Sequence, residues 1–206
     1  MNQKTRIISA ISGATVLTVV AAILLLHSRI SLTAPVNSPQ SSRETVANAP
    51  SIGGPFTLVR ADGQTVSDRT YRGKWLLVYF GYTFCPDVCP TTLNNIAQAL
   101  VELGPDASKF VPIFITVDPK RDTPKVIGEY VRSFDARLVG LTGTPDQIAT
   151  IAKEYRVYYA RQSAGQDYLV DHSSFVYLMT PQGVLAKVIP GSTPGAAMAK
   201  IIRPLI

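Results

Sequence analysis

The stretch WLLVYFGYTFCPDVCPTTLNNIAQALVEL, residues 75–103, contains both cysteines of this 206-residue chain. Residues 75–80 form a continuous apolar run of strand length, which is typical of a central strand covered on both faces. After the loop with Cys85 and Cys89, residues 91–103 place apolar side chains at helical spacing. The stretch therefore predicts a buried strand, a loop that carries two thiols, and a helix.

The segments around this stretch predict an α/β sandwich. Residues 56–59 and 64–66 flank Asp62-Gly63, which is a strong hairpin signal near the start of the domain. Residues 110–117 form a second apolar run, in which Pro112 indicates a sheet position that tolerates a missing N–H donor. Further elements are expected as helices at residues 124–134, 145–155 and from 194 onward, and as a late hairpin at residues 175–189. This order predicts a mixed central sheet, and a cysteine loop after the first core strand is the thioredoxin-like arrangement.

The region before this domain predicts a membrane anchor and a tether. Residues 7–26 carry no charged side chain, and twenty mostly apolar residues at helical rise cover a bilayer core of roughly 30 Å. Basic Lys4 and Arg6 precede them, so we expect residues 1–6 on the cytoplasmic side, an uncleaved transmembrane helix at residues 7–27, and the body of the protein on the far side. A removed signal peptide is the less favoured alternative, because no convincing cleavage site follows. Residues 28–51 are rich in Ser, Pro, Asn, Gln and Ala and predict a flexible linker, which leaves residues 52–206 as one domain.

The charge of the chain does not favour a nucleic-acid partner. The formal net charge is +6, but from residue 52 onward sixteen Lys/Arg stand against thirteen Asp/Glu, and the two signs are interspersed. A nucleic-acid-binding domain would show a basic stripe with base-stacking aromatic residues. We therefore expect an ordinary solvated surface and no nucleic-acid binding.

The two cysteines can serve three chemical roles. On a helix, positions four apart lie on one face with Cβ atoms roughly 5–6 Å apart, so both thiols can reach one soft metal ion. They can also form a disulfide if the loop tightens, and N–H groups at a helix start stabilise the thiolate that both reactions need. A purely structural disulfide is disfavoured, because it would close a very short loop. A redox pair and a metal site both remain open.

Histidine favours the metal site over the redox pair. The chain has two histidines, and His27 at the end of the predicted span is expected to be interfacial. His172 comes just before the predicted strand at residues 175–179, where redox members of thioredoxin-like folds usually carry a cis proline. Two thiolates and one imidazole give a three-ligand site, whereas structural zinc sites are closed by four ligands. Thiolate-rich, low-coordinate sites suit copper(I), and an added nitrogen also allows copper(II).

Three motifs resemble the Sco/SenC family: YTFCPDVCP at residues 82–90, VDPKRDTP at residues 117–124, and DHS at residues 171–173. Members of this family are membrane-anchored copper proteins with a thioredoxin-like fold that assist assembly of cytochrome c oxidase. The likeness extends from about Pro55 to the C-terminus. It implies that Cys85, Cys89 and His172 bind copper. Asp118 corresponds to an acidic residue near the family's site, although a plain turn role before Pro119 fits it equally, and Asp87 would orient the loop or meet a partner rather than bind metal.

The resemblance implies a copper chaperone that supplies the dinuclear copper centre of cytochrome c oxidase subunit II. Other copper chaperones or thiol–disulfide oxidoreductases are further candidate partners. The main alternative is a thiol–disulfide reductase in which Cys85 and Cys89 keep the acceptor's cysteines reduced, and a peroxidase that uses Cys85 is a weaker one. A copper or redox sensor would use the same ligands and stays open. The predicted topology indicates a bacterial inner membrane with the domain on the periplasmic side, in preference to the mitochondrial intermembrane space.

Overall fold

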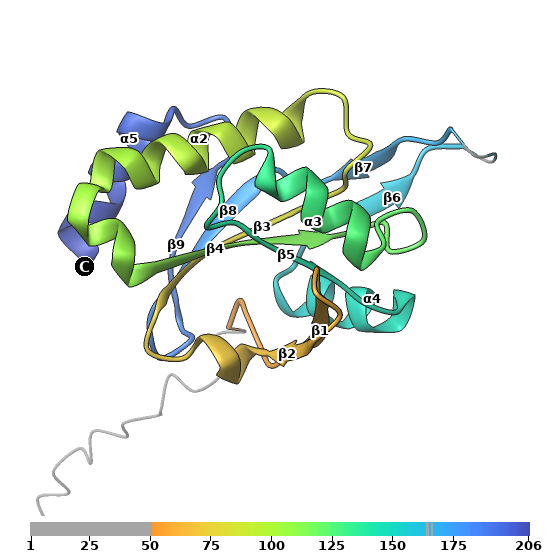
Figure 1. Ribbon diagram of the computed structural model, residues 1–206, viewed down its shortest axis with the longest axis horizontal. Helices are drawn as coiled ribbons and strands as arrows, with labels where there is room; N and C mark the ends of the chain where they lie inside the picture. The colour runs from red at the N-terminus through yellow and green to blue at the C-terminus, as the bar shows by residue number, and fades with distance from the viewer. Residues whose placement is uncertain (1–50, 164, 166) are drawn as a thin grey trace, which may run out of the picture. The chain divides into compact units, whose positions relative to one another are not determined.

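A computed structural model describes residues 51–163, 165 and 167–206 (Figure 1). Its main sheet has seven strands in the order β2-β1-β5-β4-β3-β8-β9. These strands are β1 (Thr57–Arg60), β2 (Thr65–Ser67), β3 (Trp75–Gly81), β4 (Phe110–Thr116), β5 (Val139–Thr142), β8 (Phe175–Met179) and β9 (Leu185–Pro190). The helices are α2 (Val88–Leu103), α3 (Pro124–Arg132), α4 (Pro145–Glu154) and α5 (Gly195–Ile202), with short 3₁₀ turns η1 (Asp68–Tyr71), η2 (Gly104–Lys109) and η3 (Arg203–Leu205).

The sheet is mixed, as predicted. Strand β4 runs parallel to both β3 and β5, whereas β8 is antiparallel to β3 and to β9. The predicted N-terminal hairpin is β1–β2, which joins the same sheet through an antiparallel contact with β5. Strand β5 pairs with β4 only from Ile113 onward, so Pro112 lies just before that ladder begins, where a missing N–H is tolerated.

Helices cover both faces of the sheet, which explains why β3 is apolar throughout. On one face Tyr79 contacts Phe114, and Phe114 in turn packs against Tyr130 of α3, while α2 and α5 lie side by side (Figure 1). On the other face Phe80 packs against Tyr155 at the end of α4. Consecutive side chains of a strand point to opposite faces, so both members of the Tyr79–Phe80 pair are fully buried.

Three features differ from the sequence-based expectation. Helix α2 begins at Val88, three residues before the predicted start, because Pro90 falls in the first turn, where proline breaks no helical hydrogen bond. Strand β5 was not predicted. Nor was a separate two-stranded sheet of β6 (Tyr159–Arg161) and β7 (Val170–His172), whose strands are too short to show a periodic pattern.

The predicted cytoplasmic segment (1–6), anchor (7–27) and nearly all of the predicted linker (28–51) lie outside the described residues. Within the part of the chain that the structure describes, no helix has the length and apolar character needed to cross a membrane.

Candidate metal centre

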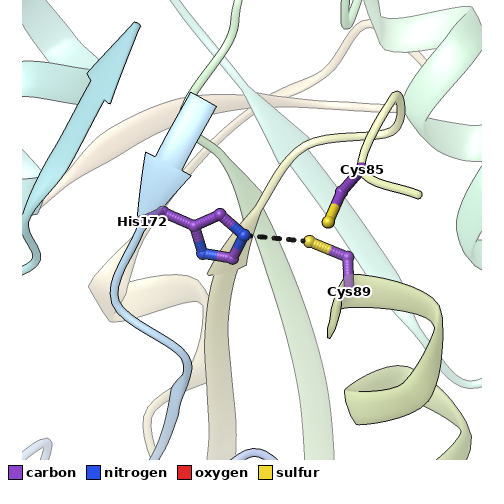
Figure 2. A group of neighbouring side chains, drawn as sticks. All are labelled: Cys85, Cys89 and His172. Carbon is purple, nitrogen blue, oxygen red and sulfur yellow. Dashed lines mark hydrogen bonds between the residues drawn. The ribbon is translucent and has the colours of Figure 1, made fainter. Parts of the chain in front are cut away.

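Cys85, Cys89 and His172 come together at the carboxyl end of β3. Cys85 lies in the loop after β3, Cys89 lies in the first turn of α2, and His172 ends β7. One potential ligand atom from each residue lies within 4.8 Å of the other two, and Cys89 Sγ is 3.3 Å from His172 Nε2. Figure 2 shows both sulfur atoms and the imidazole pointing toward one another. The sequence-based grouping of these three side chains is therefore matched by their positions.

The imidazole of His172 is oriented for ligation. Its Nδ1 lies 3.1 Å from the carbonyl oxygen of Ser173. Because a carbonyl only accepts, Nδ1 is the donor in this contact, and the other ring nitrogen, Nε2, faces the sulfur of Cys89. The rings of Tyr79 and Tyr82 contact His172 edge-on, with centroids 6.2 and 5.8 Å away. A hydrogen bond to the second ring nitrogen is what fixes the tautomer of histidine ligands in metal proteins.

The environment of Cys89 is tight and buried. The hydroxyl of Tyr79 donates to Cys89 Sγ over 3.6 Å, and both side chains are fully buried. Gly81 at the end of β3 leaves room for this sulfur, because a Cβ atom at position 81 would lie 2.5 Å from Cys89 Sγ and 2.8 Å from Phe114. The position of the Cys89 sulfur is therefore set by the backbone of β3 as well as by α2.

The two thiols have very different acidities. The pKa of Cys85 is lowered to about 3, chiefly by its hydrogen bond with the Cys89 thiol and further by His172 and by the backbone N–H groups of Asp87 and Cys89, against an opposing effect of burial. Burial raises the pKa of Cys89, and the hydrogen bond with Cys85 adds to that rise. Neither cysteine is in a disulfide. The reduced pair is thus a thiolate at Cys85 that shares the proton of Cys89.

Asp122 holds the cysteine loop in place, a role that the sequence analysis missed. Its fully buried carboxylate accepts hydrogen bonds from the Thr83 backbone N–H at 3.0 Å, the Thr83 hydroxyl at 2.5 Å and the Thr116 hydroxyl at 2.6 Å. Burial raises the pKa of Asp122, whereas these hydrogen bonds lower it. The VDPKRDTP motif contains this residue, but only its contact with Thr83, 39 positions away, identifies the role.

The two acidic residues singled out by sequence lie outside the group of three. Asp118 is buried and accepts a hydrogen bond from the Tyr168 hydroxyl at 2.6 Å, and it pairs with Arg121. Asp87 is exposed at the start of α2, and its side chain caps no helical N–H group. Asp118 thus supports the surroundings of the site, and Asp87 lies on its outer surface.

Comparison with known proteins identifies the family. The SCO1/SenC family model matches residues 44–206.

The chain belongs to the SCO1/SenC family. This SCO1/SenC chain is 46% identical over 138 residues to Protein SCO1 homolog 1, mitochondrial, of Arabidopsis thaliana, covering 66% of this chain and 41% of that protein. It therefore spans about half or less of the length of the first curated relatives that it matches. The resemblance drawn from the three sequence motifs is confirmed.

Solved structures of SCO1/SenC proteins share the fold. Arabidopsis thaliana ScoI with copper bound matches with a TM-score of 0.71 and 41% identity, covering 75% of this chain and 98% of that one. BsSco, a member of the Sco family of cytochrome c oxidase assembly proteins, is 24% identical with a TM-score of 0.61, covering 75% of this chain and 93% of that one, and shows the fold alone. The thioredoxin-like arrangement with a mixed sheet is thus the arrangement of this family.

Proposed function

We propose that this protein is a copper chaperone that binds one copper ion through Cys85, Cys89 and His172 and passes it on during assembly of cytochrome c oxidase. The convergence of two sulfur atoms and one imidazole nitrogen within 4.8 Å carries the proposal. Thiolates favour soft metals such as copper(I) and zinc, and a site of three ligands is more open than the closed four-ligand site of structural zinc. The copper-bound ScoI structure supports the same cargo.

The two sulfur atoms have unequal access to a partner. Cys85 is 9% exposed and Cys89 is fully buried. An incoming ligand of the acceptor can therefore reach the side of the site formed by Cys85 first, and copper would leave by stepwise exchange of ligands. Phe84 and Val88, each the residue before a cysteine, are exposed, so a partner that docks at the cysteine loop would meet apolar side chains there.

We also propose an acceptor and a location, which the family and the N-terminal sequence support. The match to the SCO1/SenC family, whose members the sequence resemblance associates with cytochrome c oxidase assembly, supports the oxidase as the partner. We assign the dinuclear copper centre of subunit II as the recipient, and the periplasmic side of a bacterial inner membrane as the place of transfer. An anchor at residues 7–27 and a linker at residues 28–51 would raise the effective concentration of the domain near a membrane-bound acceptor.

The test is copper binding by the reduced full chain in detergent, beside His172→Ala and a control, His27→Ala, which changes the other histidine of the sequence. We expect one tightly bound copper per chain, with sulfur-to-copper(II) charge-transfer bands that weaken or shift in His172→Ala and stay unchanged in His27→Ala. Absence of stoichiometric copper from the unmodified chain would refute the proposal.

The low pKa of Cys85 favours thiol–disulfide reduction as a second candidate function. A thiolate at Cys85 can attack a disulfide of the acceptor, and the neighbouring Cys89 can then release the mixed disulfide. Because oxidised cysteines cannot bind copper as thiolates, the two activities exclude each other in any one molecule. Reductase activity should survive in His172→Ala, whereas copper transfer should be lost, and this difference separates the two functions.

A further inference from the structure

His172 lies outside the main sheet, three residues before β8 begins. Strands β6 and β7 pair only with each other among the described residues, and Tyr159 of β6 is opposite His172 of β7. An isolated two-stranded sheet is marginally stable in water. The third ligand therefore depends on side-chain contacts that fix this small sheet against the cysteine loop.

The main contacts of this kind centre on Tyr168, two residues before β7. Its hydroxyl donates to Asp118 Oδ1 over 2.6 Å, and the central carbons of the Arg121 and Arg161 guanidinium groups lie 3.7 and 3.6 Å from its ring centroid. Two cations at these distances cannot share one face of a ring, so they stack on opposite faces. Tyr168 and Asp118 are 7% and 5% exposed, which strengthens both kinds of contact. We call these four residues the Tyr168 cluster.

The Tyr168 cluster reaches the cysteine loop. The Arg121 guanidinium carbon lies 4.8 Å from the ring centroid of Phe84, the residue before Cys85. Two residues after Tyr168, the backbone N–H of Val170 donates to the Tyr82 hydroxyl over 3.2 Å. The segment that ends in His172 is thus fixed at two points to the loop that carries the first sulfur ligand.

We propose that Tyr168 is a positioning residue that holds His172 against the two cysteines, and that it thereby sets how well the site binds copper(II) relative to copper(I). The inference rests on the proposed copper function. Two thiolates alone can bind copper(I), whereas copper(II) is favoured by the added nitrogen ligand. Releasing the β6–β7 sheet from the cysteine loop would remove the imidazole from the site and leave both sulfur atoms in place.

The test compares Tyr168→Ala, Tyr168→Phe and a control, Leu169→Ala, which shortens the exposed neighbouring side chain. Each full-length variant is titrated with copper(II) and, against a competing chelator, with copper(I). For Tyr168→Ala we expect copper(II) binding to weaken by about tenfold or more, copper(I) binding to stay within about threefold, and the charge-transfer bands to approach those of His172→Ala. Tyr168→Phe keeps the stacked ring and should lie between Tyr168→Ala and the unmodified chain, while Leu169→Ala should match the unmodified chain.

Amide hydrogen exchange of the copper-free proteins tests the same role without metal. In Tyr168→Ala the N–H of Val170 should exchange faster while the amides of β3 keep their protection, which also shows that the variant is folded. If a folded Tyr168→Ala keeps the charge-transfer bands and the copper(II) affinity of the unmodified chain, the positioning role is overturned and the copper function is left intact. If the β3 amides lose their protection in Tyr168→Ala, that variant is not properly folded, and the test then rests on Tyr168→Phe. The positioning role is refuted if Tyr168→Phe binds copper(II) as tightly as the unmodified chain and its Val170 N–H exchanges at the same rate. If the unmodified chain binds no copper, the copper function fails, and Val170 exchange alone decides whether Tyr168 fixes the small sheet.

Discussion

Replacing Gly81 with alanine is expected to displace the sulfur of Cys89. The new methyl group would lie 2.5 Å from Cys89 Sγ, about 1 Å inside ordinary van der Waals contact, and 2.8 Å from Phe114. Both neighbours are fully buried, so neither can move into solvent. Overpacking of this kind costs about 2 kcal/mol of folding free energy. Changes around a metal site that disturb the orientation of its ligands typically lower metal affinity by roughly 10- to 100-fold, and we expect a loss of copper affinity in this range.

The assay is a chelator competition for copper, combined with urea denaturation of the copper-free protein. Gly73→Ala is the matched control: Gly73 has φ +85°, a methyl group added there would meet no atom within 4 Å, and the residue precedes β3 at the end opposite Gly81. An alanine there should cost about 1 kcal/mol through backbone strain alone and leave copper affinity unchanged. Copper affinity of Gly81→Ala within about twofold of the unmodified chain would refute the argument that this glycine sets the sulfur position.

Three further predictions concern the cysteine loop. The alkylation rate of Cys85 by iodoacetamide in the reduced, copper-free protein should stay nearly constant between about pH 5 and pH 8, because its pKa near 3 keeps it a thiolate; a tenfold fall per pH unit, as for an ordinary thiol, would contradict this. Oxidation of Cys85 and Cys89 to a disulfide should abolish copper binding, and reduction should restore it; stoichiometric copper in the oxidised protein, measured by metal analysis, would count against a two-thiolate site. Asp122→Ala should lower the free energy of unfolding in urea by about 3 kcal/mol, since three hydrogen bonds from Thr83 and Thr116 lose their acceptor, and a loss below about 1 kcal/mol would show that these bonds do not hold the loop.

The sequence predicted those parts of the site that depend on local pattern. Cys85 and Cys89 follow a long apolar strand and precede a strongly periodic helix, so their place in the fold was evident from residues 75–103 alone. His172 could be grouped with them because a strand of clear apolar character, β8, begins three residues later. The motifs also supplied the family, which the comparisons confirm.

The supporting contacts could not be predicted, because they join segments with no shared pattern. Tyr168 meets Asp118 across 50 positions, and Thr83 meets Asp122 across 39. The contact of Tyr168 depends on where the unpredicted strands β6 and β7 pack, and the contact of Thr83 depends on the register of β3 with β4. Asp118 was singled out because it matches an acidic residue of the family, and its hydrogen bond with Tyr168 shows that it supports the surroundings of the site.

Cys89 and His172 are 83 positions apart in the sequence, so an ion bound to both would act as a cross-link within the chain. This interval contains β4, α3, β5 and α4, so an ion held by both residues would cross-link the two ends of most of the domain. The copper-bound protein should therefore resist proteolysis and partial unfolding more than the copper-free protein, and this added resistance would be lost when the ion leaves. A chain still emerging from the ribosome would have both sulfur atoms before β7 exists, so the complete three-ligand site would form only once folding has reached the last third of the sequence.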